Sequence, residues 1–179
     1  MMEKITAYTR QIRERCPDLP VETAALNRDG QYNDVLVVND AYIFRFAKVI
    51  PAIQTLRREV QLLRRLQKHI SLPIPRPAFA NTETGVIGEA FMGYPLIPGQ
   101  PLWWEDFQAI TDSNGLARMA AQLAGFLREL HHTPPDQVLS LDQPIADSRV
   151  DMADLYARIR AKLYGYMRLD AQKSVTNHF

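Results

Sequence analysis

Residues 33–68 change from a strand-like to a helix-like spacing of apolar residues within one short stretch. In NDVLVVNDAYIFRFAK, residues 33–48, two runs rich in Val, Ile and Phe flank the turn-like pair Asn39-Asp40. From 52 to 68 the apolar residues recur instead at three- and four-residue steps, with arginines and lysines on the other side. The pattern therefore predicts two antiparallel strands followed directly by an amphipathic helix that packs back on the sheet.

Further strand and helix signals extend this arrangement on both sides. VETAALN precedes the two strands and completes an antiparallel meander, and an amphipathic helix precedes it. Two more strands follow the central helix, and a proline-rich, extended crossing segment leads to further helices. The expected elements are a helix at 3–15, strands at 21–27, 34–39 and 42–47, a helix at 52–68, strands at about 77–82 and 86–94, and helices at 114–132 and 151–168.

This order of elements predicts an α+β fold in two lobes. Residues 1–98 form a first lobe, a small antiparallel sheet with one inserted helix. Residues 99–179 form a helical region, and the boundary lies near Gly99.

The composition excludes several classes of protein and partner. Of the 179 residues 46% are hydrophobic and 23% charged, as in globular rather than disordered proteins. The 21 basic and 20 acidic side chains nearly cancel, so the net charge of +1 favours neither nucleic acid nor an anionic membrane as partner. Cys16 is the only cysteine, which excludes an internal disulfide framework and indicates a cytoplasmic location. No stretch has the apolar length of a signal peptide or a membrane span.

Arg45 and Glu59 are two charges among apolar residues. Alternation puts Arg45 on the same strand face as Ile43 and Ala47, and Glu59 falls within the apolar arc of the next helix. Because neither charge tolerates burial alone, we expect them to pair. A strand cation paired with a helix carboxylate, under a turn with a glycine, is a common way to hold phosphates. The simpler interpretation is a partly exposed ion pair at a sheet edge.

At these residues the sequence resembles the aminoglycoside phosphotransferases and their small-molecule kinase relatives, most of all the 2″-aminoglycoside phosphotransferase subgroup. GQYNDVLVVND is similar to the nucleotide-positioning loop and second strand of that family, and YIFRFAK to its third strand. LRREVQLLRRL resembles the helix with the pairing glutamate, PIPRPAFA the next strand and FMGYPLIPGQPL the hinge. The resemblance covers most of the chain. It implies a protein-kinase-like α+β fold, with an antiparallel five-stranded N-lobe, one inserted helix and a partial helical C-lobe.

The resemblance also implies roles for individual residues in binding GTP or ATP. Arg45 takes the place of the phosphate-binding lysine and Glu59 that of its partner. Tyr94 falls at the gatekeeper position, where in the resembling subgroup a bulky tyrosine crowds the adenine amino group and is associated with use of GTP. Pro95 offers a backbone carbonyl to the purine and Ile97 a backbone amide, and proline suits a position from which only the carbonyl is required. The implied cofactor-binding residues are Gly30, Asn33, Ile43, Arg45, Glu59, Tyr94, Pro95 and Ile97.

The sequence departs from the family in two respects. The nucleotide loop has only Gly30 where protein kinases carry several glycines, and Gly30 also suits a turn that needs positive φ. The catalytic His-Gly-Asp loop, with its following asparagine, and the later Mg²⁺-binding aspartate are absent. Without them no base accepts the proton of the acceptor hydroxyl and no carboxylate holds Mg²⁺ on the phosphates. We therefore expect an inactive fragment of a longer phosphotransferase, with the Mg²⁺ ligands in its C-terminal part.

Several alternatives remain open. The chain is part of a kinase for a hydroxyl of an aminoglycoside or similar small molecule, with the acceptor undetermined, or it is a non-catalytic module that binds a nucleotide or a partner. Lys48 is the rival phosphate contact, although alternation places it on the aromatic face, where we expect a solvated lysine. Trp103 and Trp104 line a sugar site or, as we favour, are buried between lobes. The helices at 114–132 and 151–168 would lack the rest of their bundle, so we expect their apolar stripes to promote self-association.

Overall fold

The computed structural model describes residues 2–27, 30–139 and 148–178. The chain divides into two compact units, Met1–Leu139 and Ser140–Phe179. The first unit contains the sheet, and the second consists of helices. This division does not coincide with the lobe boundary expected near Gly99, which stays a prediction. Residues 28–29, in the turn that contains Gly30, lie outside the described residues.

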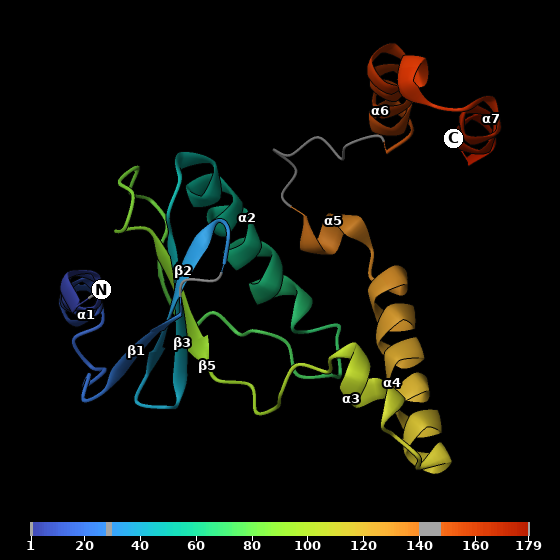
Figure 1. The fold of residues 1–179 in the computed structure, drawn as a ribbon. Helices are drawn as coiled ribbons and strands as arrows, with labels where there is room; N and C mark the ends of the chain where they lie inside the picture. The colour runs from blue at the N-terminus through green and yellow to red at the C-terminus, as the bar shows by residue number, and fades with distance from the viewer. Residues whose placement is uncertain (1, 28–29, 140–147, 179) are drawn as a thin grey trace. The chain divides into compact units, whose positions relative to one another are not determined.

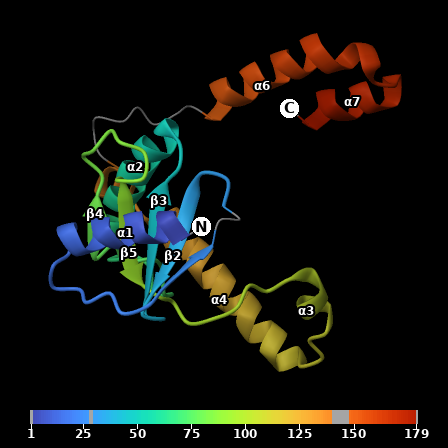
Figure 2. The same ribbon diagram turned by 60° about the vertical axis from the view of Figure 1, so that its left-hand side comes forward.

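Five antiparallel strands form one sheet in the order β1-β2-β3-β5-β4 (Figure 1; β4 is labelled in Figure 2). The first three strands form the predicted meander, and the chain returns through the last two after an inserted helix. Because β5 pairs with both β3 and β4, the crossing segment that follows it starts inside the sheet. The strands are β1 (Ala24–Asn27), β2 (Asn33–Val38), β3 (Tyr42–Ala47), β4 (Phe79–Asn81) and β5 (Phe91–Pro95).

The turn between β2 and β3 is built on Asn39 and Asp40. Both residues have positive φ, 53° and 48°, a region that Asn and Asp tolerate better than most residues. Two such residues in succession are typical of a type I′ turn, whose twist matches the flanking strands. Oδ1 of Asn39 accepts hydrogen bonds from the amides of Glu22 and Thr23, and its Nδ2 donates to the carbonyl of Pro20. The turn therefore also fixes the segment that leads into β1.

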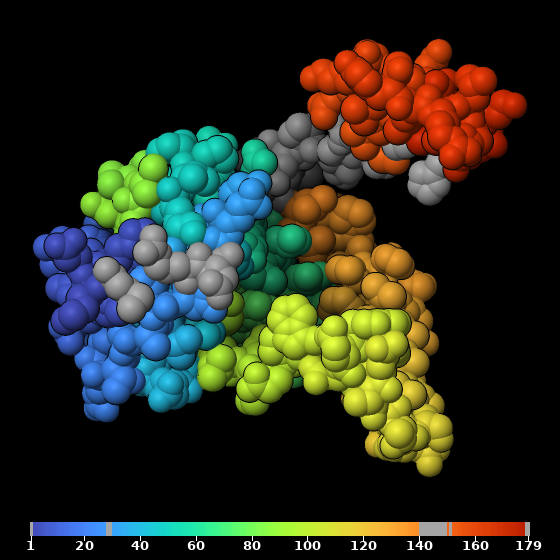
Figure 3. Space-filling model, in the orientation of Figure 1, coloured from blue at the N-terminus to red at the C-terminus, as the bar shows by residue number. Residues whose placement is uncertain are grey.

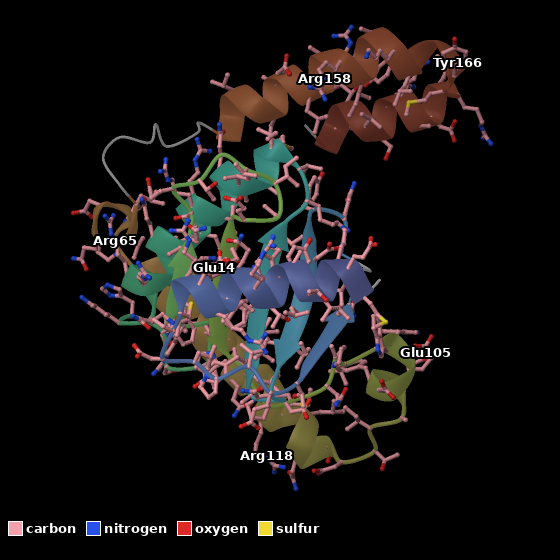
Figure 4. The ribbon with its side chains drawn as sticks, turned by 90° about the vertical axis from the view of Figure 1, so that its left-hand side faces the viewer. Glu14, Arg65, Glu105, Arg118, Arg158 and Tyr166 are labelled. Atoms are coloured by element: carbon pink, nitrogen blue, oxygen red, sulfur yellow. The ribbon has the colours of Figure 1, made fainter. Side chains whose placement is uncertain are left out.

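Helix α1 (Met2–Arg15) lies across one face of the sheet, as Figures 2 and 4 show. Tyr8 and Ile12 of its predicted stripe are buried, and the Tyr8 ring stacks on Phe46 with the ring centroids 4.1 Å apart. Burying one aromatic side chain of this kind contributes about 1.5–3 kcal/mol. The core on this face, called the α1 face below, consists of Tyr8, Ile12, Cys16, Leu19, Leu36, Val38, Phe44, Phe46 and Phe91.

Gly93 of β5 lies on the α1 face, directly opposite Phe44 of β3. The Phe44 ring occupies the space where a side chain of residue 93 would stand, because a Cβ built on Gly93 would lie 2.5 Å from Cε1 of Phe44. The ring is fully buried between β3, β4 and β5, where it also stacks on Phe79. Glycine is therefore required here for close approach.

Helix α2 (Ile50–Leu66) covers part of the other face, called the α2 face below. It begins two residues earlier than predicted. Pro51 lies in its first turn, where a backbone N–H would have no acceptor within the helix, so proline is tolerated. Leu56 and Val60 pack against Met92 of β5. A strip of this face on β2 and β3 stays only half-buried. This open strip consists of Val35, Val37 and Ile43.

Three helices follow the crossing segment within the first unit: α3 (Trp104–Gln108), α4 (Ser113–His132) and α5 (Pro135–Val138). The sequence predicted α4 but neither of the two short helices. The Asp112 side chain accepts a hydrogen bond from the Asn114 amide and so caps α4. Phe126 packs with Leu66 and Val138, which joins α4 and α5 to the end of α2. Much of α4 is nevertheless open to solvent, as Figure 3 shows.

The second unit contains α6 (Ser148–Leu163), the 3₁₀ turn η1 (Tyr164–Tyr166) and α7 (Leu169–His178). The single helix predicted at 151–168 is therefore wrong in extent, and α7 was not predicted. Gly165 lies at the break, where its backbone freedom disfavours a continuous helix. Gln172 of α7 donates a 2.8 Å hydrogen bond to the Tyr164 carbonyl, and the Tyr164 hydroxyl lies 2.8 Å from Oγ1 of Thr176. These hydrogen bonds attach α7 to the 3₁₀ turn η1.

Candidate functional site

Arg45 of β3 and Glu59 of α2 meet on the α2 face as predicted. Nη1 of Arg45 lies 2.5 Å from Oε1 of Glu59, and the two side chains are 24% and 29% exposed. Arg45 stands between Val35 and Met92 in the strand register. Partial burial makes the pair stronger than a fully solvated one. The helix carboxylate therefore fixes the guanidinium at the border between the covered part of the sheet and the open strip.

Tyr94 of β5 lies next to this ion pair. In the strand register it is opposite Ile43, so it lies on the strand next to the open strip. It also packs against the cluster of Leu56 and Val60. Burial raises the pKa of the Tyr94 phenol, and the nearby Arg45 guanidinium opposes this increase. The hydroxyl is therefore protonated at neutral pH. Its ring stands where β5 leaves the sheet for the crossing segment.

The crossing segment offers an unused backbone donor. The amide of Leu96 donates a 2.8 Å hydrogen bond to the carbonyl of Ala41, which extends the pairing of β5 and β3 by one residue. Among the described residues nothing accepts a hydrogen bond from the amide of Ile97. Ile97 as a residue is half-buried, and backbone amides in the folded part of a protein usually have a hydrogen-bond partner. It is a candidate contact for a ligand.

Asn33 and Gly30 lie at the opposite end of the strip. Alternation places Asn33 on the α2 face, and its buried Oδ1 has no hydrogen-bond partner in the described part of the chain. A Cβ at Gly30 would lie 2.6 Å from the carbonyl oxygen of Asn33. The turn before β2 is thus folded closely on itself. This close approach accounts for the glycine.

Lys48 lies on the α1 face, as alternation predicts, but it is not solvated. Its side chain is 22% exposed, and its Nζ lies 3.4 Å from Oδ1 of Asp34. Nζ also donates a 2.6 Å hydrogen bond to the carbonyl of Gly30. The expectation of a solvated lysine at the strand end is therefore wrong. Asp34 is a buried polar residue near the start of β2, and the alternation along the strand does not indicate which residues pair with it.

A pocket of about 310 Å³ lies beside the crossing segment. It contains Pro95 and Ile97 but not Arg45, so the predicted residues do not share one cavity. Sequence reasoning missed the residues that line its other wall, which precede β4. Since β4 pairs with β5, the segment entering one and the segment leaving the other must run side by side. The pocket is lined by Ser71, Pro73, Ile74, Arg76, Pro95, Leu96, Ile97 and Pro98.

Trp103 and Trp104 are 66% and 65% exposed, so the expectation that they are buried is not met among the residues that the structure describes. The Trp104 ring stacks on Phe107 of the same short helix. In the described ranges, no three His, Cys, Asp or Glu side chains gather as a metal site would require. No helix within the same ranges combines the length and apolar character needed to cross a membrane.

The model of the phosphotransferase enzyme family matches residues 23–171 of this chain. None of the curated proteins matches this chain. Among solved structures, the GDP and kanamycin complex of APH(2")-IIia is 25% identical, with a TM-score of 0.80. The match covers 95% of this chain and 56% of that chain. This chain therefore spans a little more than half the length of that relative.

Two further structures share the fold at lower identity. The streptomycin-ATP-APH(2")-IIa ternary complex is 19% identical with a TM-score of 0.66, over 94% of this chain and 54% of that chain. The apoenzyme of macrolide 2'-phosphotransferase MphH from Brachybacterium faecium is 17% identical with a TM-score of 0.70. That match covers 96% of this chain and 58% of the other. At these identities the likeness concerns the arrangement of strands and helices alone.

Proposed function

The chain belongs to the phosphotransferase enzyme family, and we propose that its α2 face binds the nucleotide that donates the phosphate, GTP or ATP. Its α+β, protein-kinase-like fold is that of the family. The phosphates lie at Arg45, the sugar and base lie along the open strip, and the base reaches the crossing segment. The 2.5 Å ion pair of Arg45 with Glu59 carries this proposal, because it fixes a cation beside an uncovered part of the sheet.

Three further observations support the same placement. The half-buried strip of Val35, Val37 and Ile43 offers apolar contact to the flat face of a purine. The free amide of Ile97 matches the predicted donor to the base. Among the solved relatives, APH(2")-IIia is a complex with GDP and APH(2")-IIa a complex with ATP. Both are nucleotides that carry a chain of phosphates, for which a fixed guanidinium is a suitable contact.

We propose that GTP is preferred to ATP. Tyr94 stands at the start of the crossing segment, where a bulky side chain narrows the space beside the base. Adenine carries an amino group at the position where guanine carries a carbonyl oxygen, so a crowded site discriminates against adenine. Replacing Tyr94 with methionine, which is flexible and lacks the hydroxyl, should raise the affinity for ATP relative to GTP. A variant with an unchanged ratio of the two affinities would show that Tyr94 does not select the base.

The phosphate role is tested by comparing Arg45→Met with Arg57→Met. Both arginines form an ion pair with a glutamate: Arg45 pairs with Glu59, and Arg57 of α2 pairs with Glu83. The Arg57 pair differs in that both of its side chains are exposed. Isothermal titration calorimetry with GTP and guanosine measures the contribution of the phosphates. We expect Arg45→Met to lower the GTP affinity by about tenfold or more and to leave guanosine binding nearly unchanged. Arg57→Met should change neither. Equal losses of GTP affinity in both variants would refute the assignment of Arg45 to the phosphates.

The acceptor and the transfer reaction concern the whole protein. By analogy with its relatives, we propose a hydroxyl of an aminoglycoside or similar small molecule as acceptor. The 179 residues contain no His-Gly-Asp sequence, so we propose that this chain binds nucleotide without transferring phosphate. We assign no Mg²⁺ ligand to the described residues. Incubation with radiolabelled GTP and kanamycin should yield no labelled antibiotic, and a labelled product would overturn this part of the proposal.

A further inference from the structure

A buried carboxylate joins helix α1 to the sheet on the side opposite the proposed nucleotide. Asp34 of β2 has no exposed surface. Its Oδ2 accepts hydrogen bonds of 2.8 Å from both Nζ of Lys4 and the hydroxyl of Tyr8. Its Oδ1 faces Nζ of Lys48 at 3.4 Å. Two lysines from distant parts of the sequence thus share one anion, which satisfies the requirement that a buried charge be paired.

The two lysines differ in what else they contact. Lys4 lies on α1, and its side chain is 44% exposed. Lys48 directly follows β3 and holds the turn before β2 at two points. Its Nζ donates to the carbonyl of Gly30 at 2.6 Å, and its backbone amide donates to the carbonyl of Tyr32 at 2.9 Å. Asp34 therefore anchors the ammonium that in turn orients the Gly30 peptide.

Orienting this carbonyl also orients the next amide. None of the described peptide bonds is cis, and a planar trans peptide directs its C=O and its N–H in opposite directions. With the Gly30 carbonyl directed at Lys48, the N–H of Gln31 is directed away from Lys48. Nothing in the described part of the chain accepts a hydrogen bond from that N–H. An oriented and unused backbone donor in a tight turn is a suitable contact for an anion.

We propose that Lys48 is a positioning residue for the triphosphate: anchored by Asp34, it holds the Gly30 turn so that the Gln31 amide faces the phosphates. The inference rests on the proposed function, since it needs a nucleotide on the α2 face. It assigns Lys48 an indirect role from the α1 face, in place of the direct phosphate contact considered from the sequence. The turn has a single glycine, and an ion pair on the far side of the sheet compensates for its limited backbone freedom.

Lys4 provides a matched control for the test. Lys48→Met and Lys4→Met each remove one lysine from Asp34, but only Lys48→Met releases the Gly30 carbonyl. Calorimetry with GTP and guanosine on the 179-residue chain separates phosphate contacts from base contacts. We expect Lys48→Met to weaken GTP binding by about tenfold, as for the loss of one charge-assisted hydrogen bond, and to alter guanosine binding by less than about twofold. Lys4→Met should alter both by less than about twofold.

Each outcome decides the matter. Equal weakening of GTP binding in the two variants, or equal loss of GTP and guanosine binding in Lys48→Met, overturns the positioning role while leaving the proposed function intact. A wild-type chain that binds neither ligand overturns both. If Lys48→Met does not fold, Lys48→Gln replaces it, because glutamine also lacks the charge that pairs with Asp34. A tenfold loss of GTP binding with guanosine binding unchanged in that folded variant then supports the role, and GTP binding at wild-type strength contradicts it.

Discussion

Replacing Gly93 with alanine tests the packing that supports the crossing segment. The added Cβ would lie 2.5 Å from Cε1 of Phe44 and 2.8 Å from both Cδ1 and Cζ. Carbon atoms in contact normally stand about 3.5–4.0 Å apart, so the ring has to move by about 1 Å. Phe44 is fully buried and is in contact with Phe79 and Phe91, which leaves it no free space. The variant must therefore distort the core or shift β5.

The change in the free energy of unfolding has two opposing contributions. An extra group forced into a well-packed core costs about 1–3 kcal/mol. A change from glycine to alanine at an unstrained position stabilises by about 0.4–1 kcal/mol through the unfolded chain. With a gain of about 0.5 kcal/mol, we expect a net loss of about 0.5–2.5 kcal/mol. Each kcal/mol lowers the Tm of a domain of this size by about 2–4 °C, so the Tm should fall by several degrees.

Thermal and urea unfolding followed by circular dichroism measure this loss. Gly85→Ala is the control, because a Cβ at Gly85 meets no atom within 4 Å, and it should leave stability unchanged or slightly raised. Combining Gly93→Ala with Phe44→Leu removes Cε1 and Cζ, two of the three atoms that collide, so the double variant should lose about 1 kcal/mol less than the sum of the single variants. An unchanged or raised Tm in Gly93→Ala would show that the ring does not lie over Gly93.

Two further predictions concern charge and exposed surface. Burial by itself raises the pKa of Asp34, but hydrogen bonds from Lys4, Tyr8 and Lys48 and the charge of Lys4 outweigh it and hold the pKa below its ordinary value. A carboxylate whose pKa is lower in the folded than in the unfolded protein stabilises the fold at pH values above the unfolded pKa. The difference in the free energy of unfolding between wild type and Asp34→Asn, measured with urea, should therefore shrink as the pH falls below the ordinary aspartate pKa of 3.8. The apolar stripe of α4 predicts concentration-dependent association, which Leu123→Glu, at a residue 58% exposed, should reduce in light scattering. A wild-type chain that stays monomeric at high concentration would contradict this.

The sequence by itself determined the first three strands, helix α2 and the faces on which their side chains lie. The change of apolar period between residues 48 and 52 separates β3 from α2, and alternation along YIFRFA assigns Arg45 to one face and the aromatic residues to the other. The pairing of Arg45 with Glu59 follows from these two patterns, because a short connection forces the helix back onto the adjacent strand. Such inferences succeed because they depend on local periodicity and on neighbours close in the chain.

Only the tertiary structure decided which distant residues meet. That α1 covers the aromatic face, and thereby brings Lys4 and Tyr8 to Asp34, depends on how a helix about twenty to thirty residues away docks on the sheet. The position of β5 between β3 and β4 likewise places the segment before β4 beside the crossing segment and creates the pocket there. No periodic pattern encodes these contacts, because they arise from the order of strands and the docking of whole elements rather than from the alternation within any one of them.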